Sequence, residues 1–244
     1  MTRFTTWMIW KQPDFFLASI GHLDSEDMIY IEEIDLTCSP INIVNCLAKR
    51  IQGMLLFKKV SGLCFEVLEN INCWKLDLFD LELSTSDPEE PSSIVQHINV
   101  SEMVYMSKIS GDKKGLLDRI TCDSLELYQT SLDIRETMSL TEMFKNRVRY
   151  FKIAIDDDAS LDYQQITNYD GKGRCENIIL DYLYEKDIKD YLESWAGSVG
   201  WTVMEEDELG FGETSLILLR SNLTDWQIDP MILEELRNIG ITFD

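Results

Sequence analysis

The sequence predicts an α+β fold, with mainly antiparallel sheets and a few packed helices. Apolar and polar residues alternate over several short segments, as in half-buried strands, and other segments carry apolar residues at steps of three and four, as in helices. The chain has 244 residues, of which 45% are hydrophobic and 10% aromatic. This length and composition are sufficient to bury a sizeable core, so the chain is expected to fold without disulfides or metals.

The N-terminal part of the chain shows the order strand, helix and further strands. Alternation predicts a strand over residues 28–36, and Ser39-Pro40 then starts a helix that ends at Gly53. Three apolar or alternating runs follow, separated by short turn-forming sequences, at residues 54–60, 63–69 and 73–83. Because short turns join antiparallel strands, these runs are predicted to form a β-meander.

The middle of the chain contains a candidate linker and one further helix. Residues 84–93 include two prolines and are typical of a linker or a long surface loop. Ser139 and Glu142 have the spacing of a capping box, which predicts a helix over residues 140–148. Strands are predicted on either side, at residues 94–106 and 149–155.

The C-terminal part repeats the outline of the N-terminal part. A strand is predicted over residues 178–184, with a helix as the alternative. A helix over 185–196 follows, and then a hairpin with strands at 201–204 and 216–219. A final helix is predicted over 229–240. The chain is therefore predicted to form two similar strand-helix-strand-hairpin lobes, residues 1–90 and 91–244, with a single domain as the alternative.

The charge of the chain favours some partners over others. It carries 44 acidic and 22 basic residues, a net charge of −22. Phosphate contacts need Lys and Arg, so direct binding to nucleic acid or to an anionic membrane is disfavoured. A basic protein is the complementary partner, and opposite charge accelerates such an encounter. The alternative is that the charge serves solubility alone.

The cysteines indicate a reducing compartment. They have no paired C-x-x-C spacing, and Lys11, Pro13 and Asp14 interrupt the apolar N-terminal stretch before it reaches the length of a signal peptide. We therefore expect a cytoplasmic protein whose thiols are reduced and serve as small core residues. The six are Cys38, Cys46, Cys64, Cys73, Cys122 and Cys175.

No established catalytic, metal-binding or cofactor-binding motif is present. The glycine pairs Gly171-Lys-Gly173 and Gly210-Phe-Gly212 lack the residues of a phosphate-binding loop and are predicted to be turns. With two histidines, the chain has few residues for zinc or nucleophile chemistry. We predict no catalytic residues, no metal, no cofactor and no enzymatic activity. A hydrolase with an unrecognised pair of carboxylates is the alternative.

Acidic clusters and two tryptophans are the candidate binding residues. Adjacent carboxylates repel one another, and a basic partner would relieve this repulsion. Trp195 and Trp201 precede one cluster in the sequence and, if exposed, would provide the buried contacts that dominate protein interfaces. The acidic candidates are Asp156, Asp157, Asp158, Asp162, Glu205, Glu206, Asp207 and Glu208. Solvated surface loops are the alternative interpretation of these acids.

These observations lead to the hypothesis of an acidic inhibitor protein. Its most concrete form is an immunity protein that neutralises a basic toxin, nuclease or other nucleic-acid-binding protein by direct contact. A counter-defence protein that imitates nucleic acid is a variant, and it requires rows of exposed acids at regular separations.

Overall fold

The computed structural model describes part of the chain, and this part belongs to two compact units, Met1–Thr130 and Ser131–Asp244. The described residues are 6–10, 28–33, 35, 52–63, 68, 71–83, 98–154, 161, 163–181, 186–207 and 214–220. The domain boundary predicted after residue 90 lies outside them. So do most of the helix predicted to end at Gly53 and the whole of the helix predicted over 229–240.

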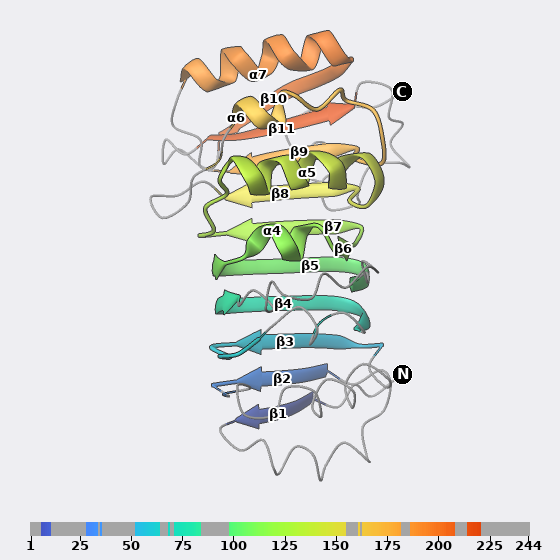
Figure 1. Cartoon of the computed structure of the whole chain (residues 1–244). Coiled ribbons are helices and arrows are strands. Elements are labelled where there is room, and N and C mark those ends of the chain that lie inside the picture. The colour runs from blue at the N-terminus through green and yellow to red at the C-terminus, as the bar shows by residue number, and fades with distance from the viewer. Residues whose placement is uncertain are drawn as a thin grey trace, which may run out of the picture. The chain divides into compact units, whose positions relative to one another are not determined.

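The first unit contains a sheet whose described strands all run parallel (Figure 1). The strands are β1 (Thr6–Trp10), β2 (Met28–Glu32), β3 (Met54–Lys58), β4 (Asn72–Leu83), β5 (Ile98–Gly111), β6 (Ile120–Thr121) and β7 (Ser124–Tyr128). From β1 to β5 each strand pairs with the next one along the chain, and β5 also pairs with β6 and β7. The short helix α4 (Lys113–Leu117) lies between β5 and β6 in the sequence.

The prediction of mainly antiparallel sheets is therefore wrong, although the broader assignment to mixed α and β structure is correct. The expected meander fails at β3 and β4, which pair in parallel. Leu68, placed by prediction in a strand between them, is helical. Alternation reports that one face of a strand is buried and carries no information on direction. Parallel neighbours need a crossover connection, which here spans residues 59–71.

A constant register stacks the apolar side chains of these strands into two continuous rows. Each row contains one residue from each of five neighbouring strands, and none of the ten is more than 1% exposed. The rows are Ile29, Leu55, Leu76, Val104 and Leu125, and Ile31, Phe57, Leu78, Met106 and Leu127. The core of the first unit is thus built by nearest-neighbour stacking, as in repeat proteins.

A third row shares an unusual backbone conformation. Five non-glycine residues have positive φ angles between 46° and 55°, and each directly follows a member of one row of the register. They are Glu33, Lys59, Asp80, Lys108 and Gln129, which follow Glu32, Lys58, Phe79, Ser107 and Tyr128. Their amides continue the pairing, since Glu33 N donates to Lys58 O at 3.0 Å and Lys59 N to Phe79 O at 3.1 Å. The local twist places two residues, instead of one, between buried positions such as Leu78 and Leu81.

This row gives a testable prediction at Lys59, which is exposed and has φ of 52°. Lys59→Gly is expected to leave stability unchanged or raise it by up to about 1 kcal/mol, because glycine adopts positive φ without steric cost. Lys59→Val is expected to lower stability by about 1–2 kcal/mol, since a β-branched side chain clashes in this conformation. Urea unfolding of both variants measures the difference, and equal midpoints would contradict the assigned backbone.

The described part of the second unit combines a smaller mixed sheet with three helices (Figure 1). β8 (Tyr150–Ala154) pairs in parallel with β9 (Asn177–Asp181), while β11 (Thr214–Arg220) pairs antiparallel with both β9 and β10 (Trp201–Asp207). The helices are α5 (Ile134–Asn146), α6 (Tyr163–Ile166) and α7 (Lys186–Val199). The predicted hairpin and the helix expected over 185–196 are confirmed. None of the described helices combines the length and apolarity needed to cross a membrane.

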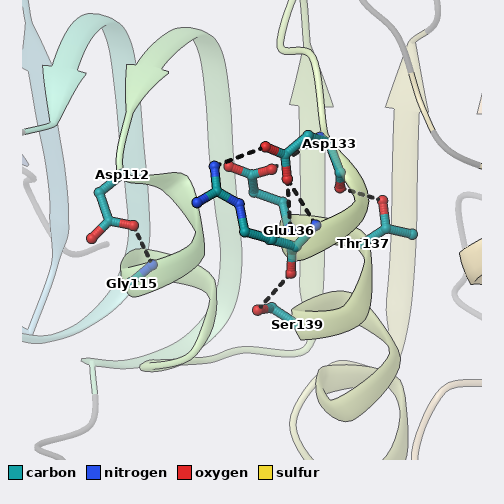
Figure 2. A network of polar contacts seen from close by, with 7 residues as sticks. Asp112, Gly115, Asp133, Glu136, Thr137 and Ser139 are labelled. Carbon is teal, nitrogen blue, oxygen red and sulfur yellow. Dashed lines mark hydrogen bonds and ion pairs between the residues drawn. The ribbon is translucent and has the colours of Figure 1, made fainter.

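Side-chain caps fix the starts of α4 and α5, as Figure 2 shows. In the first unit Asp112 Oδ1 accepts a hydrogen bond from Gly115 N at 3.0 Å. In the second, Asp133 Oδ1 accepts from Arg135 N at 2.7 Å, and Glu136 Oε2 accepts from Asp133 N at 2.9 Å, which completes a capping box. Such a cap contributes about 1 kcal/mol to stability.

The helix predicted over 140–148 therefore begins several residues earlier than expected. Two capping-box sequences lie close together, and the prediction used the second, Ser139 to Glu142. In the structure the first box, Asp133 to Glu136, begins the helix. Ser139 lies inside α5, where its hydroxyl donates to Arg135 O at 3.2 Å. A serine within a helix can bond to the preceding turn in this way, so its spacing to Glu142 alone does not identify the start.

Candidate binding surface

One face of the parallel sheet of the first unit carries the two buried core rows, and the other, here called the outward face, is only partly buried. The outward face contains two rows that alternate with the apolar core rows along β2, β3, β4, β5 and β7. They are Tyr30, Leu56, Asp77, Tyr105 and Glu126, and Glu32, Lys58, Phe79, Ser107 and Tyr128. Except for Asp77 and Ser107, these side chains are half-buried.

Three aromatic rings form a continuous stripe across this face. Phe79 of β4, Tyr105 of β5 and Tyr128 of β7 make up this aromatic stripe. The ring centroids of Phe79 and Tyr105 are 4.9 Å apart, and those of Tyr105 and Tyr128 are 5.0 Å apart. The register places the rings on diagonal positions of neighbouring strands, which is within reach of aromatic side chains. Each ring is half-buried and therefore still presents apolar surface to a partner.

A carboxylate with an unusual environment lies beside the stripe. The side chain of Asp77, directly opposite Tyr105 in the register, is 7% exposed. Its Oδ2 atom is 3.4 Å from Lys75 Nζ, while its buried Oδ1 atom has no hydrogen-bond partner. Burial raises the pKa of Asp77, and the positive charge of Lys75 opposes this shift. A buried acceptor without a donor is costly and can accept one more hydrogen bond.

Two carboxylates flank the ring at the centre of the stripe. Burial raises the pKa of Tyr105, the charges of Glu126 and Asp77 raise it further, and a hydrogen bond with Ser107 opposes them. Both carboxylates occupy the same row as Tyr105, one on each neighbouring strand. An aromatic face flanked by two carboxylates is suited to a cationic side chain, because both the ring and the acids attract positive charge.

The acids predicted as binding residues are only partly covered by the structure. Asp156, Asp157, Asp158, Asp162 and Glu208 lie outside the described residues. Glu205, Glu206 and Asp207 belong to β10, which is at the end of the described sheet of the second unit. Glu205 is exposed and forms an ion pair with Lys189 of α7. The charge of this acid is thus partly compensated within the unit.

The two predicted tryptophans lie in the interior of the second unit. Trp195 is 7% and Trp201 is 3% exposed, and their ring centroids are 5.8 Å apart. Their indole Nε1 atoms donate to Tyr169 O at 2.9 Å and to Gly171 O at 3.0 Å, respectively. The two side chains therefore hold the segment before β9 against α7 and β10, respectively. In this structure neither is an exposed anchor for a partner.

The described cysteines behave as the sequence predicts for core residues. Cys73, Cys122 and Cys175 are buried. Burial raises the pKa of Cys73 to about 12 and also raises the pKa of Cys175. Both thiols therefore remain protonated at neutral pH, which makes them poor nucleophiles.

Within the described ranges, no three side chains among His, Cys, Asp and Glu are grouped as metal ligands. The residues of the outward face were missed by sequence reasoning. The alternation in β4, where Lys75, Asp77 and Phe79 separate buried leucines, assigns them to one face. It does not bring them next to Tyr105 and Tyr128, because that requires the parallel register.

Comparison with known proteins identifies no relative: no family model, no curated protein and no solved structure matches this chain.

Proposed function

We propose that this chain is a non-catalytic binding protein that holds a basic protein partner by direct contact, in the manner of an immunity protein that inhibits a toxin or nuclease. The observation that carries the proposal is the aromatic stripe beside the carboxylates of Asp77 and Glu126. Tyrosine is enriched among the residues that contribute most of the binding energy in protein interfaces. The carboxylates on either side of Tyr105 favour a partner with positive charge at this place.

The distribution of charge supports a basic partner. Residues 1–130 contain 20 acidic and 11 basic residues, and residues 131–244 contain 24 and 11. Both units are therefore acidic. A field of one sign attracts a partner of the opposite sign over a distance of about 10 Å at moderate ionic strength, and this mainly raises the association rate.

The outward face fits a protein partner better than imitation of nucleic acid. A mimic needs rows of acids that follow a phosphate track. Here the rows mix both signs, as in the Glu32–Lys58 ion pair at 2.8 Å. The adjoining row of positive φ also mixes them, with Glu33, Lys59, Asp80 and Lys108. Mixed charge around an aromatic centre is typical of a protein interface.

Affinity capture followed by direct titration tests the proposed function. The tagged chain is incubated with lysate of its native cells at low and high salt, and captured proteins are identified, purified and titrated. We expect a basic protein that binds with saturable stoichiometry and whose association slows as salt increases. Variants in which Glu205 to Glu208, or separately Asp156 to Asp158, are replaced by neutral amides should associate with this partner more slowly than the wild type at the same salt concentration. Retention of only neutral or acidic proteins, or of none, would contradict the proposal.

A further inference from the structure

We propose that Asp77 and the neighbouring ring of Tyr105 form a seat for an arginine side chain of the partner protein. This inference rests on the proposed function and adds to it the residue type that the outward face recognises. In the bound state the guanidinium donates to both carboxylate oxygens of Asp77 and lies against the ring of Tyr105.

The unsatisfied oxygen of Asp77 is the first argument for the seat. Oδ1 is buried and has no donor, and the side chain as a whole is 93% buried, since its exposure is 7%. A buried carboxylate normally has its oxygens satisfied by hydrogen bonds. The missing donor has to come from a group that approaches the outward face, because Asp77 alternates with the core residues Leu76 and Leu78.

Lys75 is the second argument, because it occupies the place of the cation in the free protein. Its Nζ atom is 3.4 Å from Asp77 Oδ2, which is longer than the 2.7–2.9 Å that is usual for a charge-assisted hydrogen bond. The ammonium thus provides charge but leaves the carboxylate incompletely bonded. Lysine has a long, flexible side chain that can swing toward solvent, so a guanidinium can displace it without movement of the backbone.

The surrounding rings are the third argument, and they favour arginine over lysine. The guanidinium is planar, binds a carboxylate through two parallel N–H groups and stacks on aromatic faces. Tyr105 lies opposite Asp77 in the register and contacts the rings of Phe79 and Tyr128 at 4.9 and 5.0 Å. A lysine ammonium would also pair with the charge of Asp77, but it can neither form two parallel hydrogen bonds to the carboxylate nor stack as a planar group on the ring.

Titration with two small probes tests the seat. N-acetyl-arginine methylamide and N-acetyl-lysine methylamide are added separately to the full chain, and the Tyr105 ring and Asp77 carboxylate signals are followed by NMR. We expect saturable shifts at both residues with the arginine probe and affinity at least about fivefold lower for the lysine probe. Asp77→Asn should weaken arginine binding about tenfold, which corresponds to the loss of one charge-assisted hydrogen bond.

Two further variants make the test specific. Lys75→Gln removes the internal competitor and is expected to tighten arginine binding several-fold, the opposite direction to Asp77→Asn. Glu82→Gln removes the same charge from an exposed position of the same strand and is expected to leave affinity unchanged within about twofold. Thermal melting confirms that each variant is folded. If Asp77→Asn does not fold, the predicted increase in arginine affinity of Lys75→Gln still tests the seat.

The seat is excluded if both probes bind equally, if Glu82→Gln weakens binding as much as Asp77→Asn, or if Lys75→Gln weakens it. Failure of the seat and failure of the proposed function are distinguishable. A captured basic protein that binds the wild type and Asp77→Asn equally supports the function and excludes the seat. Selective binding of the arginine probe without any captured basic protein supports the seat and excludes the function.

Discussion

Gly173→Ala is expected to destabilise the second unit by about 3 kcal/mol or more, because two independent penalties combine. Gly173 has φ of 137°, a backbone conformation that residues other than glycine rarely adopt. A Cβ atom there would lie 2.5 Å from Lys145 Cα and 2.6 Å from Lys145 O. These are backbone atoms at the end of α5, so no side-chain rotation relieves the overlap.

Neighbouring hydrogen bonds prevent the two segments from separating. Arg174 N donates to Lys145 O at 2.9 Å, and Cys175 N donates to Phe144 O at 2.8 Å. The carbonyl of Gly173 accepts from Arg220 Nη2 at 2.6 Å. The segment before β9 is bonded to α5 on one side and to β11 on the other. A movement that accommodates the methyl group would stretch these hydrogen bonds. The chain bends at Gly173, and the contact with Lys145 gives the reason why this bend requires glycine.

Two other glycines provide graded controls for urea unfolding. Gly200, directly after α7, has φ of 77° but open space around its Cβ position, so Gly200→Ala is expected to cost only about 1 kcal/mol. Gly197 lies inside α7 with open space, so Gly197→Ala should stabilise by up to about 1 kcal/mol. A different ranking of the three variants would contradict the close packing of Gly173 against α5.

Phe57→Ala is expected to destabilise the first unit by about 3–5 kcal/mol. The Phe57 side chain is 0% exposed and lies in the core row between Ile31 of β2 and Leu78 of β4. Its removal leaves a cavity in the core row, because the apolar side chains of each strand are packed against those of the neighbouring strands. The loss is measured as a decrease of the urea midpoint, followed by circular dichroism.

Leu56→Ala is the matched control, since Leu56 is the adjacent residue of the same strand but belongs to the outward face. Leu56 is half-buried, so truncation is expected to cost less than about 1.5 kcal/mol. The ratio of the two losses reports which face of β3 is the core. Equal losses would mean that both faces are packed alike, and the outward face would then not be available to a partner.

Much of the secondary structure could be predicted from local pattern. Alternation predicted the strand at β2, apolar runs predicted those at β3 and β9, and the strand at β8 was also predicted. The helical stripe with its following glycines located α7. The hairpin of β10 and β11 was also correct. These features depend on interactions between residues close in the chain, such as one buried face or a helix C-terminus, and are therefore visible in a short window of sequence.

The candidate site could not be predicted in this way. Abundance of charge directed attention to the acids at residues 156–158 and 205–208 and to two tryptophans that are buried in the second unit. The outward face instead depends on Asp77, Tyr105 and Tyr128, which belong to three different strands. Each is unremarkable in its own segment, and only the pairing of β4, β5 and β7 makes them neighbours.

The sequence by itself determined that the chain is acidic, that it has a core of mixed α and β structure, and which residues of several strands face that core. The tertiary structure decided the direction of the strands, the register that stacks five of them, and the burial of Trp195 and Trp201. The physical reason is that alternation encodes the burial of one face, whereas direction and register are set by contacts between residues distant in the chain.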